Sequence, residues 1–266
     1  MRKLSSILIL SMCFLQALAQ EPSWRKLWTI PADSSAIWDA DETGSLYVVV
    51  GNQISKYSQD GKLAMTQSIR SIGTIQKVDA ENSLKPTLFS EDQQQVCFLD
   101  NALAVQNCVD LAELNIRMAS QFSSSVQTDR FWIYDQSNSQ LILITARNLQ
   151  QQRVQNLKGL IDFKELQSFE EYNNQLFMID TEYRLLIFDN FGNLMNEWII
   201  PPHRAAHPLG EGMLITNGTR IDAYSFTNQE LLPFYLSTSE IIAFHFSGNR
   251  LFVQDNSGIS CFELLD

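Results

Sequence analysis

The chain has 266 residues, of which 45% are hydrophobic, and a formal net charge of -11 at pH 7. This acidity, without any cluster of Lys and Arg, argues against nucleic acid and anionic membrane surfaces as partners. No apolar run beyond the N-terminus approaches the roughly 20 residues that a membrane-spanning helix requires, so we expect no membrane span.

The first 19 residues have the features of a cleaved secretory signal peptide. Arg2 and Lys3 precede an apolar run that ends at Ala17-Leu18-Ala19, a cleavage site of the A-x-A type. We therefore expect the protein to be exported, to the periplasm or out of the cell, with a single domain over residues 20–266. Export also permits disulfide bonds.

Six apolar, β-rich runs follow at nearly regular intervals. They begin at Leu46, Leu88, Phe131, Leu176, Met213 and Leu251. Each is followed by a short polar turn and a second strand with a bulky apolar residue near its end. A period of about 40 residues is typical of the four-stranded blades of a β-propeller. The sequence thus predicts an all-β, six-bladed propeller with antiparallel blades at about 35–70, 74–114, 117–158, 163–200, 205–237 and 240–266.

The last unit is short of one strand. It supplies strands only at about 241–247, 250–255 and 258–265, whereas an unassigned β-rich segment, residues 24–30, precedes the first blade. If this N-terminal strand completes the last blade, the ring is closed and its sheet edges are protected. We therefore expect residues 24–30 to be the closing strand.

Five of the six runs carry Asp or Asn four residues after their first residue: Asp92, Asp135, Asp180, Asn217 and Asp255. Repeated carboxylates suggest either a cation site or caps for the turns that follow. Because a site normally draws different residues from different blades, we expect these side chains to bond nearby backbone N–H groups.

The fourth unit resembles a known repeat. Its segments Leu176–Asp180 and Arg184–Asp189, followed by Gly192, are similar to the NHL-type repeat of six-bladed propellers. The resemblance implies the propeller fold and a family habit of binding proteins or other ligands with the loops of one face. It implies no single activity.

Two of the three histidines occupy equivalent positions. His207 and His245 lie six residues before their strand starts, as Glu170 does one blade earlier. This position falls near the end of the strand closest to the central channel. Two imidazoles and a carboxylate suit a divalent metal ion such as zinc, and no other cofactor is indicated. The alternative is that Glu170, His207 and His245 are ordinary channel-lining residues.

Cys97 and Cys108 flank a polar turn in the second blade. A hairpin centred between Ala102 and Leu103 places them opposite each other, at a separation that suits a disulfide. A slip of one residue would instead put one cysteine on the other face, so the pairing stays open. Cys261 has no partner and is expected to be a buried thiol.

The sequence carries no strong catalytic motif: it lacks G-x-S-x-G, phosphate-binding and dinucleotide-binding glycine patterns. The favoured interpretation is an exported propeller that binds a protein partner or a small ligand. One alternative is a metal-dependent enzyme of the central channel, lyase-like or lactonase-like. The other is a structural accessory subunit without a small ligand.

Overall fold

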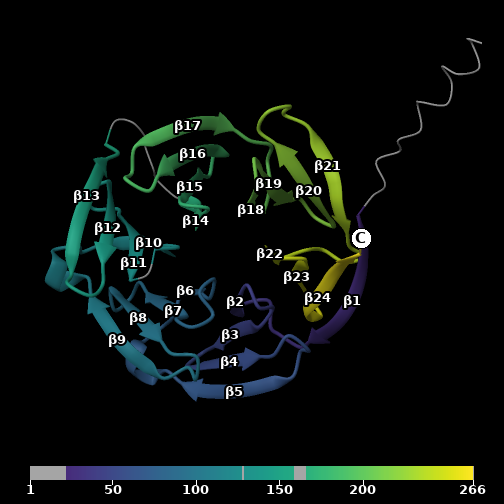
Figure 1. Cartoon of the computed structure of the whole chain (residues 1–266), viewed down its shortest axis with the longest axis horizontal. Coiled ribbons are helices and arrows are strands. Elements are labelled where there is room, and N and C mark those ends of the chain that lie inside the picture. The colour runs from purple at the N-terminus through teal and green to yellow at the C-terminus, as the bar shows by residue number, and fades with distance from the viewer. Residues whose placement is uncertain (1–21, 128, 159–165, 266) are drawn as a thin grey trace, which may run out of the picture.

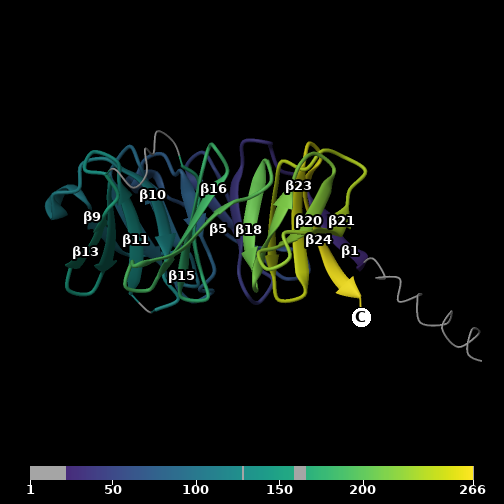
Figure 2. The ribbon, with the colours of Figure 1, turned by 90° about the horizontal axis from the view of Figure 1, so that it is seen from above.

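The computed structural model describes residues 22–127, 129–158 and 166–265, so the expected signal peptide, residues 1–19, lies outside the described residues. The described chain folds into six four-stranded sheets arranged around a central axis (Figure 1). Seen from the side, the ring is flat, with its strands running across its thickness (Figure 2). The predicted six-bladed, all-β propeller is confirmed.

Each blade is an antiparallel sheet whose strands follow one another from the channel outwards. Blade 1 contains β2 (Ile37–Ala40), β3 (Leu46–Val50), β4 (Gln53–Tyr57) and β5 (Leu63–Ser68). Blade 2 contains β6 (Lys77–Asp79), β7 (Thr87–Ser90), β8 (Gln95–Leu99) and β9 (Val105–Asp110). Blade 3 contains β10 (Ala119–Ser124), β11 (Arg130–Asp135), β12 (Gln140–Thr145) and β13 (Gln150–Asn156).

The second half of the ring repeats this order. Blade 4 contains β14 (Leu166–Tyr172), β15 (Gln175–Asp180), β16 (Arg184–Asp189) and β17 (Leu194–Ile199). Blade 5 contains β18 (Ala205–Leu209), β19 (Gly212–Thr216), β20 (Arg220–Ser225) and β21 (Leu231–Leu236). Two short 3-10 helices, η1 (Arg70–Ile72) and η2 (Ala112–Leu114), follow β5 and β9. No described helix has the length and apolarity to cross a membrane.

The core lies between the blades. The middle strands are buried on both faces, as β15 and β16 show, because each sheet is covered by a neighbour on either side. One hydrophobic cluster fills each of the six blade interfaces; Phe98 of blade 2, for example, packs edge-on against Phe131 of blade 3 at 5.9 Å. Two-sided burial explains why these strands read as continuous apolar runs rather than as alternating patterns.

The N-terminal strand closes the ring. β1 (Ser23–Ile30) pairs antiparallel with β24 (Gly258–Leu265) and so becomes the outer strand of blade 6, beside β23 (Arg250–Asp255) and β22 (Ala243–Ser247). Ile30 is 5% exposed and packs in the interface between blades 6 and 1. The segment predicted to complete the last blade occupies this position.

Aspartates cap three of the five turns at which a cap was expected, whereas Asp92 and Asn217 have no such side-chain hydrogen bond within the described ranges. Asp135, Asp180 and Asp255 each accept a hydrogen bond at Oδ1 from the backbone N–H two residues further on, at 2.7–3.1 Å. In Asp180 the same oxygen also accepts from the N–H of Arg184 at 2.9 Å. These carboxylates therefore shape the hairpins.

The cysteine pair of blade 2 is in register. Cys97 of β8 lies opposite Cys108 of β9, their Cα atoms are 4.1 Å apart, and the two sulfurs form a disulfide. Of the two registers that the sequence left open, the structure has the one with facing cysteines. Cys261 is a free, fully buried thiol, and burial raises its pKa to about 12.

Substitution of Gly258 tests the closing strand. A Cβ at Gly258, where φ is +136°, would lie 2.1 Å from the carbonyl oxygen of Ile30, so Gly258→Ala must push β1 away. We expect it to lower the free energy of unfolding by about 2–4 kcal/mol. Gly51→Ala is the matched control, because Gly51 also has a positive φ but no atom within 4 Å. It should cost about 1 kcal/mol. Equal losses in chemical denaturation would contradict the closure.

Thiol counting tests the disulfide. In a chain beginning at Gln20, unreduced denatured protein should react with a thiol reagent only at Cys261. Replacing Cys97 and Cys108 together by alanine should lower the free energy of unfolding by about 2–3 kcal/mol, because the unfolded chain gains freedom. Three reactive thiols in the unreduced protein would show that the bond is absent.

Candidate functional site

One position of each innermost strand carries a polar side chain, and in five of the six blades this side chain lines the central cavity. In every blade it pairs with the second residue of the apolar run on the next strand, which is Tyr47, Phe89, Trp132, Phe177, Leu214 or Phe252. We call these six residues the channel ring: Asp39, Lys77, Ser123, Glu170, His207 and His245. Each blade contributes one of them.

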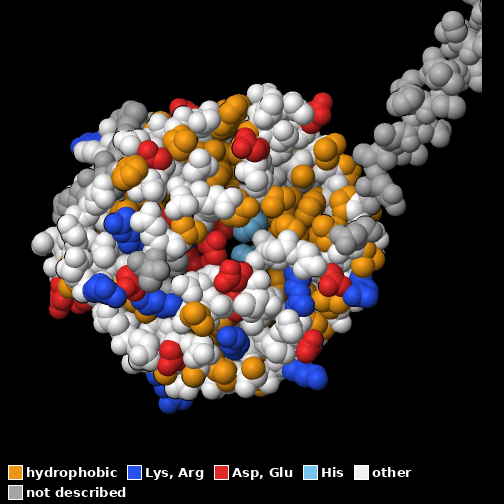
Figure 3. Space-filling model, viewed as in Figure 1, with side chains coloured by type: hydrophobic (Ala, Val, Ile, Leu, Met, Phe, Trp, Pro, Cys, Tyr) orange, Lys and Arg blue, Asp and Glu red, His pale blue; other side chains and the backbone are white. Residues whose placement is uncertain are grey.

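The structure brings the three residues singled out from the sequence together. His207 Nδ1 lies 3.0 Å from Glu170 Oε1, and the imidazole rings of His207 and His245 are 4.7 Å apart between centroids. The third histidine, His203, is elsewhere: it is 5% exposed, and its Nδ1 bonds the carbonyl of Pro201. Figure 3 shows a hollow at the centre of one face, with acidic side chains on one side and histidine on the other.

Sequence reasoning missed Asp39, Lys77 and Ser123. Blades 4, 5 and 6 join their first two strands by two-residue turns, so the ring residue always lies six positions before the apolar run. Blades 1, 2 and 3 have longer connections, which shift the ring residue further back. In blade 2 the residue six positions before Leu88 is Asn82, a loop residue whose side chain accepts a hydrogen bond from the N–H of Leu84. A search for polar residues with an apolar partner across each hairpin would have found all six.

Glu170 and His207 form an ion pair between blades 4 and 5. His207 Nε2 lies 3.0 Å from the carbonyl oxygen of Phe246, which can only accept, so this nitrogen carries a proton. Burial disfavours the charge of Glu170, but His207 outweighs it, with help from His245 and Lys77, and the pKa of Glu170 is lowered. His207 is thus held at both ring nitrogens, by Glu170 at Nδ1 and by the carbonyl of Phe246 at Nε2.

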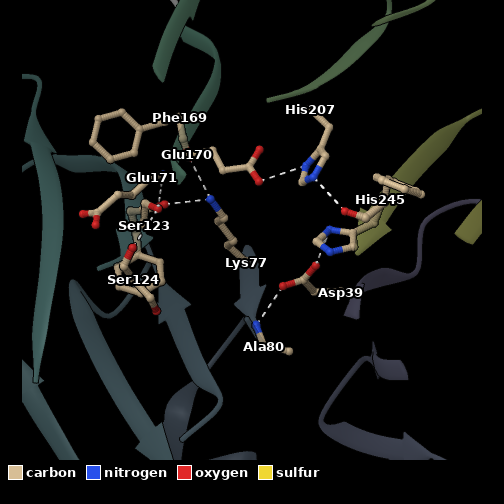
Figure 4. A network of polar contacts seen from close by, with 12 residues as sticks. Asp39, Lys77, Ala80, Ser123, Ser124, Phe169, Glu170, Glu171, His207 and His245 are labelled. Carbon is tan, nitrogen blue, oxygen red and sulfur yellow. Dashed lines mark hydrogen bonds and ion pairs between the residues drawn. The ribbon is translucent and has the colours of Figure 1, made fainter. Parts of the chain in front are cut away.

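Asp39 and His245 form a second ion pair, between blades 1 and 6. His245 Nδ1 lies 3.0 Å from Asp39 Oδ1, and Asp39 Oδ2 accepts from the N–H of Ala80 at 2.7 Å (Figure 4). Burial opposes both charges, yet Asp39 raises the pKa of His245 to about 9, and His245 holds the pKa of Asp39 below its ordinary value. His245 Nε2 has no hydrogen-bond partner within the described ranges, and His245 lines the cavity.

Lys77 joins three blades. From blade 2, its ammonium donates to the carbonyl oxygens of Phe122 in blade 3, at 2.9 Å, and Phe169 in blade 4, at 2.8 Å. Figure 4 shows the side chain reaching from its own strand toward Glu170 and Phe169. The bonds of this cation therefore go to backbone carbonyls, although its charge still acts on the acidic groups nearby.

All ring residues except Ser123 line a cavity of about 610 Å³, together with three further acidic residues, Asp79, Glu81 and Glu171. Glu171 is 2% exposed and accepts from Trp132 Nε1, Ser125 Oγ and the N–H of Val126. Burial raises the pKa of Glu171 in spite of these bonds. The cavity lies within the size range of small-molecule binding sites, about 300–1,000 Å³.

The geometry gives no support to a metal ion. Among the residues that the structure describes, no group of three or more His, Cys, Asp or Glu side chains is arranged to hold one. Both nitrogens of His207 are bound to protein groups, which leaves no lone pair for a metal. Within this cluster Glu170 pairs with His207, whereas His245 pairs with Asp39, and both pairs link neighbouring blades.

No protein-family model matches the sequence, and no curated protein matches it. The fold matches solved structures. A Bacteroides thetaiotaomicron protein of unknown function has a TM-score of 0.66 at 8% identity, over 92% of this chain and 77% of that one. Virginiamycin B lyase from Staphylococcus aureus has a TM-score of 0.62 at 11% identity, over 92% of this chain and 100% of that one. BBS1N, solved in complex with ARL6DN, has a TM-score of 0.56 at 14% identity, over 84% of this chain and 75% of that one.

These likenesses show the fold alone, because the identities are low. The neighbours include a lyase and a protein solved with a protein partner, so the propeller does not decide between catalysis and binding. The resemblance of the repeat to the NHL type stays a prediction.

The pair of Asp39 and His245 makes stability depend on pH. The pKa of His245 is raised from 6.5 to about 9, so its contribution is complete below about pH 6.5 and is lost as the pH rises through 9. The pKa of Asp39 is lowered from 3.8, so its contribution is present above that value and is lost in acid.

Titration of the imidazoles by NMR checks this pair. We expect His245 to titrate near pH 9 in the unmodified protein. In Asp39→Asn its pKa should fall, because burial is then opposed only by the more weakly acting Glu170 and Glu81. His203, whose pKa burial lowers, is the internal control and should not change. An unchanged His245 titration in Asp39→Asn would show that Asp39 is not the cause.

Proposed function

We propose that this protein is an exported propeller that binds a small polar ligand in its central channel. The observation that carries the proposal is the channel ring, five of whose polar side chains, from five blades, line a cavity of about 610 Å³. Pockets of this size with a few convergent polar groups are the usual sites of ligand binding. The signal-peptide pattern of residues 1–19 supports export to the periplasm or outside the cell.

The charges exceed what the fold requires. Blade interfaces are already filled by six apolar clusters, as the one between blades 3 and 4 illustrates. Buried ion pairs often stabilise a protein no better than apolar residues of similar volume, because charged groups lose their hydration. Keeping Asp39, Glu170, His207 and His245 around an open cavity is therefore better explained by a ligand than by packing.

An acid–base enzyme of the channel is the second candidate. The observation that favours it is that His245 lines the cavity and that its Nε2 has no partner among the described residues, while Asp39 orients its other nitrogen. Carboxylate–imidazole pairs of this kind act as general acids and bases. Turnover of a bound ester, lactone or amide that disappears in His245→Gln would favour this candidate over simple binding.

Blocking the channel tests the proposed binding. The measurement is thermal unfolding in the presence of small cations, anions or neutral sugars. We expect at least one of these classes to raise Tm, because a ligand at 100 times its Kd adds about 2.7 kcal/mol to the free energy of unfolding. Ser247 lines the cavity, so Ser247→Trp should abolish that rise. Ser68→Trp, on the exposed outer strand β5, is the matched control and should retain it.

Two results would contradict the proposal. One is that no class of compound raises Tm. The other is that the rise persists in Ser247→Trp, which would place the ligand outside the channel. Export is checked separately: the mature protein should begin at Gln20 by mass spectrometry, and a chain without residues 1–19 should stay in the cytoplasm.

A further inference from the structure

We propose that the channel ligand carries a cationic nitrogen, an ammonium or a guanidinium group, which binds between Asp79 and Glu81. The inference rests on the proposed ligand-binding function and names the chemical class of the ligand. It concerns one wall of the channel, the segment of blade 2 that runs from Lys77 to Glu81.

This segment alternates between charged and apolar residues. Val78 and Ala80 pack in the apolar cluster between blades 1 and 2. Successive side chains of β6 point to opposite sides, so Lys77 and Asp79 face the channel, and Glu81, two residues beyond the strand, lines the same cavity. Two carboxyl groups thus stand next to each other on one wall.

Asp79 has an oxygen without a partner. The side chain is only 8% exposed, and its Oδ2 accepts from the N–H of Ser124 at 2.8 Å. Its Oδ1 is buried and has no hydrogen-bond partner among the residues that the structure describes. Leaving a buried carboxyl oxygen unpaired is costly, and nearly all such atoms in folded proteins are paired. Asp79 therefore lacks one hydrogen-bond donor, on a side chain that lines the cavity.

Glu81 is also unpaired. It has no hydrogen bond or ion pair within the described chain, and its side chain is open to the water of the cavity. The other channel carboxylates are occupied: Asp39 by His245 and Ala80, and Glu171 by three donors. The two unoccupied acceptors belong to the same segment of blade 2.

The protein supplies too little positive charge for this wall. Five carboxyl groups line the cavity, whereas its basic residues are Lys77, His207 and His245. The N–H groups of Lys77 go to the carbonyls of Phe122 and Phe169, and His207 is held by Glu170 and Phe246. A cation from the ligand would supply both the missing donor and the missing charge.

Protonation in the free protein is consistent with this arrangement. Loss of hydration inside the channel is the main cause that raises the pKa of Asp79 and of Glu81. Asp79 raises that of Glu81 further, and Asp39 and Glu170, facing them from β2 and β14, raise both. Lys77 opposes the rise for Asp79, and His245 opposes it for Glu81. Because a bound cation favours the ionised carboxylates, binding should release protons and strengthen as the pH rises.

Calorimetry with defined probes tests the inference. The probes are cadaverine and agmatine as free amines, and the tripeptide Gly-Lys-Gly, which stands for a side chain of a protein partner. The diol of the same length as cadaverine and the dicarboxylate glutarate are the uncharged and anionic controls. We expect the amines or the peptide to bind and the two controls not to bind. Binding of the amines would identify a small-molecule ligand, and binding of the peptide would identify a side chain of a protein partner.

Substitutions place the binding on this wall. Glu81→Gln and Asp79→Asn should each weaken the binding of the amine about tenfold or more. Glu91→Gln, an exposed carboxylate outside the cavity, is the matched control and should bind as the unmodified protein does. Because Asp79 is buried, the decisive variant is Glu81→Gln, which should leave the fold unchanged. Heats measured in buffers of different ionisation enthalpy should reveal proton release.

Several outcomes would overturn the inference. They are failure of every cationic probe, unchanged affinity in both variants, or binding of Ca²⁺, Mg²⁺ or Zn²⁺ without binding of amines. If glutarate or the diol binds instead, and Ser247→Trp abolishes that binding, the cation is wrong but the ligand-binding channel stands. If no probe of any class binds in the channel, both proposals fail.

Discussion

The pairing of β1 with β24 is the constraint on which the rest of the structure depends. It joins the first described strand to the last one, gives blade 6 its fourth strand and places Ile30 in the interface with blade 1. Without it, β24 would present an unpaired edge and one of the six blade interfaces would lose its cover. A closed ring is also what makes six innermost strands converge on one axis, so the channel and its charges follow from this closure.

Convergence concentrates charge in a small, partly dehydrated volume. Most of this charge is balanced by contacts between blades. Adjacent blades are joined by the pair of Asp39 and His245 and by the pair of Glu170 and His207. Lys77 of blade 2 donates to backbone carbonyls of blades 3 and 4. These contacts tie the blades together at the axis, where there is little room for an apolar core. Among the described residues the balance is incomplete on the wall formed by blade 2, where Asp79 Oδ1 and Glu81 lack partners, and this is where the proposed ligand meets the protein.

Much of the fold could be predicted from the sequence, because each blade repeats the same local demands. Middle strands covered on both sides need continuous apolar runs, and the turns that follow them need a cap such as Asp180. These demands act over a few residues, so they leave a period in the chain. The shortage of one strand in the last unit likewise predicted the place of residues 24–30. The register of Cys97 and Cys108 could not be decided in this way, because a hairpin shifted by one residue satisfies the same pattern.

The sequence by itself determined the number of blades, the phase of their strands and the equivalence of Glu170, His207 and His245. That equivalence was visible only because blades 4, 5 and 6 share two-residue turns, which keep the spacing constant. The tertiary structure alone decided that Asp39, Lys77 and Ser123 complete the ring and that the histidines pair with carboxylates. The physical reason is that connections of different length shift a residue along the chain without moving it in the sheet. Residues that pair across the channel lie far apart in the sequence, so no local sequence pattern predicts which side chains face each other there.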